Sequence, residues 1–183
     1  MRRLRRGDEG AFAEAFEHYR PRIFPFLLRY CRSRSIAEEL TQETFLRLAK
    51  SAKGLRADTR LGVWLFVVAR NLGVSYLRRA FLHQDRLTAL IGLEAPVPRR
   101  PETPFEVIAA ADATGRLAAA VASLPPIYRE VVLLLGVEEL SALEVAEVLS
   151  LSVEAVRQRW SRGRRLLQAI LEDEAPPAGG RHE

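Results

Sequence analysis

Four prolines stand within ten residues near the middle of this chain, in the stretch Ala95-Pro96-Val97-Pro98-Arg99-Arg100-Pro101-Glu102-Thr103-Pro104. Proline lacks a backbone N–H and fixes φ, so this stretch cannot continue a helix and favours an extended polyproline conformation. Any packed core must therefore lie before or after it. We predict a linker over residues 84–105.

The two sides of this linker differ in charge. Residues 1–110 hold 20 basic and 12 acidic side chains, whereas residues 111–183 hold 8 and 11. In a chain of 183 residues, each side is long enough for one small domain. We predict a first domain over residues 1–83, a second domain over residues 106–174 and a frayed tail over residues 175–183.

Composition excludes several classes of protein. Cys31 is the only cysteine, which excludes an internal disulfide and a multi-cysteine zinc site. The longest apolar runs, 63–69 and 131–137, are too short to span a bilayer, and Gly7 follows the N-terminal arginines where a signal peptide would have its apolar segment. The chain has no glycine-rich phosphate loop and no Cys/His pair beside a nucleophile. We therefore expect a cytoplasmic protein that is not an enzyme, uses no metal or cofactor and does not insert into a membrane.

Apolar residues recur with the period of a helix on both sides of the linker, and no strand alternation persists, so we expect an all-α fold. In the first domain this period predicts helices over about 10–30, 35–50 and 61–79. Pro21 and Pro25 predict a break or kink in the first of them.

The ends of these helices carry local signals. Ser35 and Glu38 have the spacing of a capping box at the start of the second helix, and Gly54 follows its end. Arg78 and Arg79 suit the negative end of the third helix, which we therefore predict to stop there.

The second helix has an outward face that packing does not explain. At about 100° per residue its core stripe consists of Ile36, Ala37, Leu40, Thr44 and Leu48. The opposite side presents Glu39, Gln42, Glu43, Leu46 and Lys50. A leucine among acids and amides on the wet side is typical of a protein-docking patch, although a solvated face with one leucine is also common.

The third helix is apolar nearly all round. We predict an inner face of Leu61, Leu65, Val68, Leu72 and Tyr76. The opposite face has Val63, Val67, Arg70, Asn71, Val74 and Arg78, with Trp64 on the border. Such a helix can pack inward while it touches nucleic acid, or it can be a buried central helix with Trp64 in the core.

The second domain has a sharper pattern. Pro126 opens a helix, because proline is tolerated in its first turn. A capping box at Ser141 starts a short helix that ends near Leu149, and Ser152 is a natural N-cap for a long helix over 153–171. A short helix, a tight turn and a longer helix form a helix-turn-helix.

The long helix separates an apolar side from a polar side. Its apolar side has Val153, Val156, Trp160, Gly163 and Leu167. Its outward side has Glu154, Arg157, Gln158, Ser161, Arg162 and Arg165. Arginine and glutamine are the side chains that read guanine and adenine in the major groove, whereas the alternative is a solvated helix face, which usually mixes both signs of charge.

Several segments together resemble one family. Glu39–Leu48 resembles region 2.2 of bacterial RNA polymerase sigma factors, and Trp64–Leu72 with Tyr76–Arg79 resembles regions 2.3 and 2.4. Leu124–Val132 resembles the opening of region 4, which is continued by Leu140-Ser141, Ala146–Leu149 and Val156–Arg159. Two such domains and a short linker are similar to the extracytoplasmic-function (ECF) subgroup.

The resemblance implies a fold, a function and sites. It implies an all-α chain of two small helical domains, a region 2 bundle and a region 4 helix-turn-helix, which directs promoter-specific transcription initiation. The implied partners are core RNA polymerase, promoter DNA and an anti-sigma factor. The implied contact with the polymerase clamp helices involves Glu39, Gln42, Glu43 and Leu46. The implied −10 element contacts are Leu55, Arg56, Asp58, Arg60, Trp64, Arg70, Asn71 and Arg78. The implied −35 element contacts are Arg157, Gln158, Ser161, Arg162 and Arg165.

Five positions depart from the family pattern, and two of them, Ala142 and Leu143, replace a more usual pair of an aromatic and an acidic residue. Ser75 stands where the family often has Asp or Asn, which implies a different promoter preference. Glu139 and Ser150 stand where glycine is frequent. If those two positions have positive φ, each costs up to about 1 kcal/mol.

The alternative function is a stand-alone helix-turn-helix regulator that binds a duplex operator as a dimer. It explains residues 124–171 equally well but gives no purpose to the loop 55–60 or to the exposed Leu46. A regulator binds its operator without polymerase, whereas a sigma factor binds promoter DNA weakly or not at all by itself.

Overall fold

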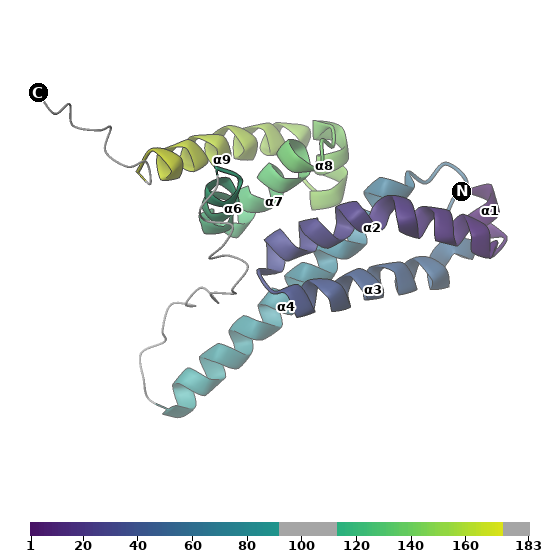
Figure 1. Ribbon diagram of the computed structural model, residues 1–183, viewed down its shortest axis with the longest axis horizontal. Coiled ribbons are helices and arrows are strands. Elements are labelled where there is room, and N and C mark those ends of the chain that lie inside the picture. Colours follow the sequence, from purple (N-terminus) through teal and green to yellow (C-terminus); the bar gives the residue numbers. More distant parts are fainter. Residues whose placement is uncertain (92–112, 174–183) are drawn as a thin grey trace, which may run out of the picture. The chain divides into compact units, whose positions relative to one another are not determined.

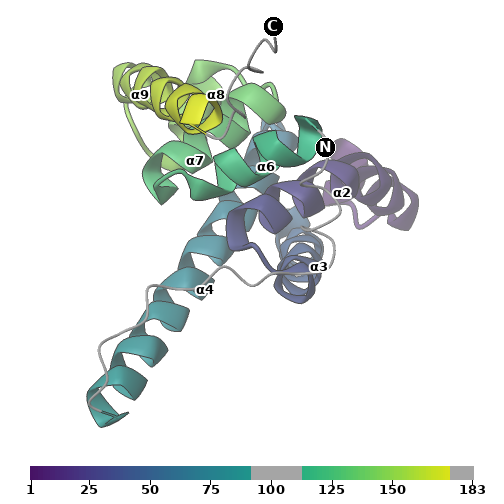
Figure 2. The ribbon, with the colours of Figure 1, turned by 60° about the vertical axis from the view of Figure 1, so that its left-hand side comes forward.

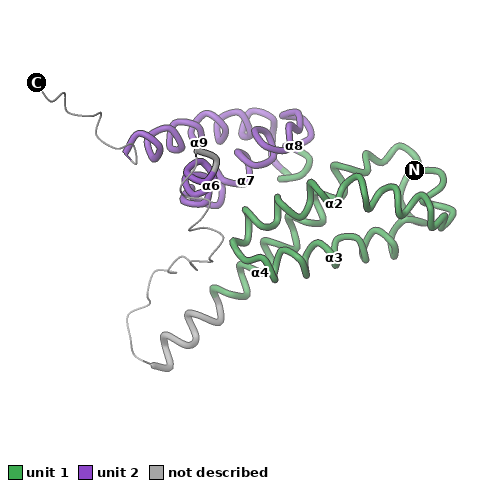
Figure 3. The backbone as a smooth tube through the Cα atoms, viewed as in Figure 1, with its two compact units in different colours: residues 1–101, 147–150 green, residues 102–146, 151–183 purple. Residues whose placement is uncertain are grey.

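The computed structural model describes residues 1–91 and 113–173, and within them every regular element is a helix (Figure 1). The chain forms two compact units, residues 1–101 with 147–150 and residues 102–146 with 151–183 (Figure 3). Residues 147–149 complete helix α8 and Ser150 follows it, so we describe them with that helix. No helix in the described part is both long and apolar enough to cross a bilayer.

The first unit is a bundle of three long helices with a short one at its end. Helices α2, α3 and α4 pack against one another in pairs, and α1 lies against α2 and the 3-10 turn η1 (Figures 1 and 2). Their bounds are α1 Arg2–Arg5, α2 Glu9–Cys31, α3 Arg34–Ser51, η1 Ala52–Gly54 and α4 Leu61–Ile91.

Aromatic rings join α2 to α4 in the centre of this bundle. The rings of Phe26 and Phe66 meet edge to face with centroids 5.5 Å apart, and Tyr30 stacks beside Phe26 at 5.7 Å. Gly73 lets the two helices approach closely, because a Cβ added there would lie 2.7 Å from Cδ1 of Tyr30. Only glycine fits this crossing without displacement of the tyrosine.

Helix α2 runs through Pro21 and Pro25 from Glu9 to Cys31, so of the predicted break or kink the break is wrong. The two prolines are four residues apart and therefore lie on the same side of the helix. On the other side Ile23, Phe26 and Leu27 are fully buried. Their packing outweighs the backbone hydrogen bonds that the two prolines cannot donate.

The predicted start of α3 and the predicted end of α4 are also wrong. Helix α3 begins at Arg34, and Glu38 accepts from Nε of that arginine at 3.0 Å instead of capping at Ser35. Helix α4 continues to Ile91, inside the segment 84–105 that we predicted as linker. Residues 80–91 contain no glycine or proline, so nothing local stops the helix there. The rest of that linker and the predicted tail lie outside the described residues.

The buried face of α4 differs from the predicted one. Its buried residues are Val63, Leu65, Phe66, Ala69, Leu72 and Gly73. Of the predicted inner face, Leu61, Val68 and Tyr76 are only half-buried, and Val63 was expected to point outward. The face is rotated because α4 packs against both α2 and α3.

The second unit contains the predicted helix-turn-helix. Ser141 Oγ accepts from the backbone N–H of Glu144 at 3.3 Å, while the Glu144 carboxylate accepts from the Ser141 backbone N–H at 2.9 Å, which confirms the capping box. Ser152 Oγ accepts from the Ala155 N–H at 3.1 Å and caps the long helix, as predicted. The elements are α6 Ala113–Ser123, α7 Pro126–Val132, a π turn η2 Leu133–Val137, α8 Ala142–Leu149 and α9 Val153–Asp173. Helix α6 was not predicted from the sequence.

Helix α9 packs on α7 through small residues and one ring. A Cβ at Gly163 would lie 3.0 Å from Cγ2 of Val132, and one at Gly136 would lie 3.1 Å from the Trp160 ring. Glu139 and Ser150, on either side of α8, have φ of 53° and 54°. These are the left-handed conformations for which the sequence analysis expected a cost of up to about 1 kcal/mol each.

Candidate functional site

The outward face of α3 carries the four residues implied for polymerase docking. Leu46 is 52% exposed, although it is apolar. Glu39 and Gln42 are exposed beside it, and Glu43 is half-buried with its carboxylate accepting from Nε of Arg47 at 2.9 Å. At about 100° per residue these four side chains share one face of the helix. The structure therefore presents one apolar side chain inside an acidic and amide surround.

The opposite face of α3 explains why Leu46 is left outside. Phe45 is buried and meets Phe16 of α2 at 4.8 Å. Thr41 and Thr44 are buried too, and their hydroxyls donate to the Ala37 and Leu40 carbonyls of their own helix. This face fills the contact with α2 and α4 without Leu46.

The loop 55–60 connects η1 to α4 and is polar and exposed, except for the half-buried Leu55 and Thr59. Arg56 donates from Nε and Nη2 to the two Asp58 carboxylate oxygens, at 3.1 Å each. The Arg56 guanidinium lowers the pKa of the Asp58 carboxyl, chiefly through this hydrogen bond. The Arg60 carbonyl accepts from the Trp64 N–H at 3.0 Å and so starts α4.

On α4 the implied DNA contacts separate into a stripe and a flank. Trp64, Asn71 and Arg78 are spaced seven residues apart, which places them within about 40° of one another on the side opposite the buried face. Asn71 and Arg78 are exposed and Trp64 is half-buried. Arg70 lies about 100° to the side of Asn71 and donates to its Oδ1 at 3.4 Å. The structure thus brings three of these four residues into one line.

The arginines of α9 divide by what they contact. Arg159 is paired with the buried Glu130 of α7, with Nη1 and Oε1 3.6 Å apart, and Arg164 lies over the Trp160 ring at 5.4 Å. Arg157 and Arg162 are exposed and make no ion pair or hydrogen bond with any residue that the structure describes. They stand at the two edges of the outward face. Only part of the arginine run is therefore available to a ligand.

The middle of the α9 outward face is polar. Gln158 is exposed and its Nε2 lies 3.4 Å from a Glu154 carboxylate oxygen. Arg165 is exposed and donates from Nη2 to Ser161 Oγ at 3.4 Å, while Ser161 is half-buried. All five residues implied for the −35 element thus lie on one helix.

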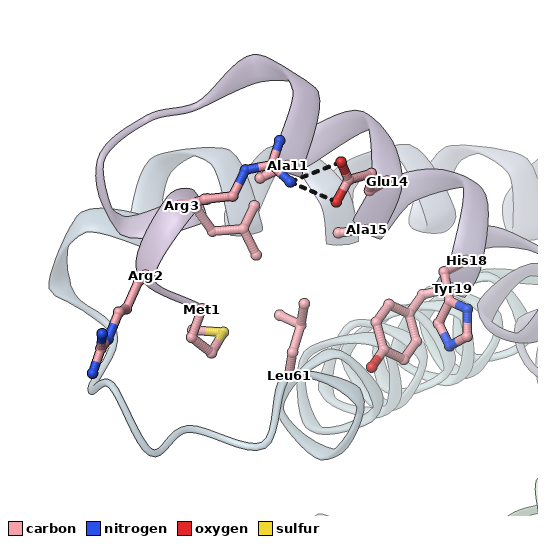
Figure 4. A pocket seen from close by; sticks show the side chains of 10 residues that line it. Met1, Arg2, Arg3, Ala11, Glu14, Ala15, His18, Tyr19 and Leu61 are labelled. Carbon is pink, nitrogen blue, oxygen red and sulfur yellow. Dashed lines mark hydrogen bonds and ion pairs between the residues drawn. The ribbon is translucent and has the colours of Figure 1, made fainter.

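The packing of α1 was not predicted from the sequence. Arg3 donates from Nε to Asp8 at 2.9 Å and from Nη1 to Glu14 at 2.8 Å, and Leu4 is buried. An open pocket of about 590 Å³ lies between α1, α2 and the start of α4. Figure 4 shows the side chains that line it. Arg3 lowers the pKa of Asp8, chiefly through their hydrogen bond. The alternation of arginines around Leu4 was the signal that could have indicated a short packed helix.

Two family models match the chain in the order of the two units. Sigma-70 region 2 matches residues 15–81, and Sigma-70, region 4 matches residues 114–167. The first match spans α3, the loop 55–60 and most of the described α4, and the second spans the helix-turn-helix.

Characterised relatives extend the match to nearly the whole chain. The chain is 32% identical over 173 residues to the RNA polymerase sigma factor CarQ of Myxococcus xanthus, with 93% of this chain and 95% of CarQ covered. It is 25% identical over 178 residues to the ECF RNA polymerase sigma factor SigW of Bacillus subtilis, with 94% and 95% covered.

Solved structures share the fold. A structure of CnrH in complex with the cytosolic domain of CnrY aligns with a TM-score of 0.73 at 21% identity, over 94% of this chain and 95% of CnrH. The sigma factor RpoE of Bartonella quintana, in complex with the anti-sigma factor NepR, aligns with a TM-score of 0.70 at 20% identity, over 90% and 99%. With both sigma regions matched in order and an RNA polymerase sigma factor 32% identical along almost its full length, the chain belongs to the ECF sigma factors, which direct RNA polymerase to promoters.

Proposed function

We propose that the first unit docks on core RNA polymerase through the outward face of α3 and opens the −10 element, while α9 of the second unit reads the −35 element. The observation that carries the proposal is the exposed Leu46 within its acidic and amide surround. A protein interface typically has an apolar centre and a polar rim, which is the composition of this face.

The docking step is tested with purified core polymerase. Leu46→Asp keeps the fold, because the side chain lies outside the bundle, and weakens core binding by about 30-fold or more, as truncation of an interface hot spot does. Ala13→Asp, at an exposed position on α2, is the control and leaves core binding unchanged. A Leu46→Asp protein that unfolds less cooperatively, or that binds core normally, contradicts the proposal.

At the −10 element, the loop 55–60 and the α4 stripe (Trp64, Asn71 and Arg78) contact different parts of the melted strand. The loop lies at the start of α4, and Trp64 begins the stripe one turn later. Unstacking a base costs a few kcal/mol, so contacts to the exposed base and stacking on Trp64 offset that cost only for the right sequence. Asn71 and Arg78 extend the contact along the melted strand.

For the −35 element, α9 enters the major groove with its N-terminal residues deepest, as recognition helices do. Arg157 and Gln158 read base edges, and Arg162 and Arg165 contact phosphates. Promoter affinity then comes mainly from the holoenzyme, because residues 111–183 carry more acidic than basic side chains.

One reconstitution separates this proposal from the stand-alone regulator. The protein with core polymerase initiates at a promoter that core alone ignores, and the protein alone gives no specific duplex binding. Tight binding to a duplex site without polymerase would favour the regulator.

We also propose that this chain works in the cytoplasm, catalyses no reaction of its own and is held inactive by an anti-sigma factor. Of two solved structures that share its fold, RpoE is in complex with the anti-sigma factor NepR, and CnrH is in complex with the cytosolic domain of CnrY. A purified candidate partner is tested by whether it displaces core polymerase from the wild-type protein.

A further inference from the structure

Four cations gather where α1 meets η1 in the first unit, and no site proposed above includes them. Arg2, Arg5 and Arg6 come from α1 and its C-terminal end, and Lys53 comes from η1. Together they line a hollow of about 380 Å³. We call these four residues the α1 basic cluster.

The cluster is built by the way α1 packs. Leu4 is buried and Arg3 forms ion pairs with Asp8 and Glu14, so this short helix is fixed against α2. The three other arginines line one hollow together with Lys53 of η1. Gly7 follows in the left-handed conformation at φ 77°, and a Cβ there would lie 3.8 Å from the Lys53 side chain. The turn thus brings α1 beside η1.

No acid balances these charges in the described part of the chain. All four side chains are exposed, and none forms an ion pair or hydrogen bond with a residue that the structure describes. Arg3 in the same helix shows the contrast, since it contacts two carboxylates. Four cations held together in water repel one another, so the arrangement favours an anionic ligand with several charges.

The position of the cluster indicates which anion. Lys53 is separated only by Gly54 from the loop 55–60, which the proposed function assigns to the unstacked base. Because η1 directly precedes that loop, a strand whose base enters the loop can place a neighbouring phosphate over η1. Guanidinium forks match phosphate oxygens, and a positively charged groove is the usual track for a single strand.

We propose that the α1 basic cluster binds the phosphates of the melted promoter strand beside the base held by the loop 55–60. The inference rests on the proposed function. It adds a contact that neither the helix-turn-helix nor the α4 stripe supplies, and it gives the N-terminal arginines a role that depends on salt rather than on base sequence.

The test uses holoenzyme reconstituted with core polymerase and a fluorescent single-stranded oligonucleotide that carries the −10 element. In the variant Arg2→Gln/Arg5→Gln/Arg6→Gln/Lys53→Gln, binding weakens at least about tenfold at low salt, and the slope of log affinity against log salt falls by about 0.7 per lost contact. Core binding, measured separately, stays unchanged. Arg20→Gln/Arg29→Gln, two exposed arginines of α2, is the control and moves neither quantity.

Two further arms make the result specific. A variant with lysine at Arg2, Arg5 and Arg6 keeps the charge and retains most of the salt slope. Oligonucleotides with a neutral methylphosphonate at one position at a time weaken wild-type binding at the contacted phosphates and leave the glutamine variant unaffected there.

Each outcome decides the proposal. An unchanged salt slope and affinity in the glutamine variant overturns it, and so does a loss of core binding with normal DNA binding, which would mean that the cluster faces an acidic protein surface. Wild-type protein that fails to bring core polymerase to the promoter strand would instead refute the proposed function itself.

Discussion

The two units hold their charged residues in opposite ways. In the first unit, apolar side chains and aromatic rings fill the core, and most arginines stay on the outside. In the second unit, Arg129 and Glu130 are buried within α7 and tie the helices together. A count of arginines therefore says little about DNA contact, because what each arginine touches decides whether it can bind a ligand.

The same difference extends to the candidate sites. The first unit spreads them over α3, the loop 55–60, α4 and the α1 basic cluster, whereas the second unit places all of them on α9. A single change in α9 should thus disturb one function, while changes in the first unit should separate docking from DNA contact.

The largest expected effect tests the buried charge of the second unit. Arg129 Nη2 donates to the Ala122 and Leu124 carbonyls at 2.7 and 2.9 Å, at the C-terminal end of α6. Arg129→Met removes both bonds and should destabilise this unit by about 3–5 kcal/mol. Denaturation followed by Trp160 fluorescence, in a Trp64→Phe background, measures the loss.

Two controls show whether the effect stays local. Arg164→Met removes an exposed cation over the Trp160 ring and should cost at most about 1 kcal/mol. In the converse Trp160→Phe background, Trp64 fluorescence should report an unchanged first unit. An equal shift of both signals would mean that the units unfold together and would break the comparison.

A smaller effect tests the close helix crossing of the first unit. Gly73→Ala places a Cβ 2.7 Å from Tyr30 Cδ1 and should destabilise this unit by about 1–3 kcal/mol, read from Trp64 fluorescence. Gly54→Ala is the matched control, because no heavy atom lies within 4 Å of the added Cβ. If both variants unfold alike, the α2–α4 crossing is looser than described.

A loss of similar size in base discrimination, without a loss of stability, distinguishes the base-contacting residues of α9 from those that contact phosphates. Arg157→Ala and Gln158→Ala should each relax preference at particular upstream base pairs, by about 1–3 kcal/mol. Arg162→Ala and Arg165→Ala should lower occupancy of all promoters alike and flatten the salt dependence. Transcription by holoenzyme on a library randomised across the upstream element, at two salt concentrations, gives both quantities. An unchanged profile for the first pair would show that another face of α9 reads the bases.

The smallest expected effect is a gain in stability. Glu139 and Ser150 have positive φ, so Glu139→Gly and Ser150→Gly should each stabilise the second unit by up to about 1 kcal/mol in thermal denaturation. Ala142→Gly, in the first turn of α8, should have the opposite sign, because glycine is less favourable than alanine in a helix. A loss at either of the first two positions would show that the side chain contributes more than the strain.

Much of this architecture was predictable because its signals are local. Helical periodicity predicted two all-α domains, and caps at Ser141 and Ser152 placed the helix-turn-helix. The outward position of Leu46 followed from helical period alone. These features depend on residues within a few positions of one another, so no distant contact is needed to infer them.

The sequence also misled where packing competes with local preference. It predicted a break or kink at the prolines of α2, where the helix does not break. It also predicted that α4 ends at Arg79 and buries a different face. Burial of side chains against two neighbouring helices outweighed the prolines and selected the face, and neither neighbour can be identified from the segment itself.

The sequence by itself determined that this chain is two helical units with an exposed α3 face and an arginine-rich α9, because periodicity and capping act within a single helix. Only the tertiary structure decided which arginines form ion pairs within the fold, such as Arg159 with Glu130 and Arg3 with Asp8 and Glu14. It also decided which ones lie together without such a pair, as Arg2, Arg5 and Arg6 do beside Lys53. The reason is that an arginine is available to a ligand only if no carboxylate pairs with it. Most of the pairing carboxylates lie on a different element, and only folding brings the two elements together.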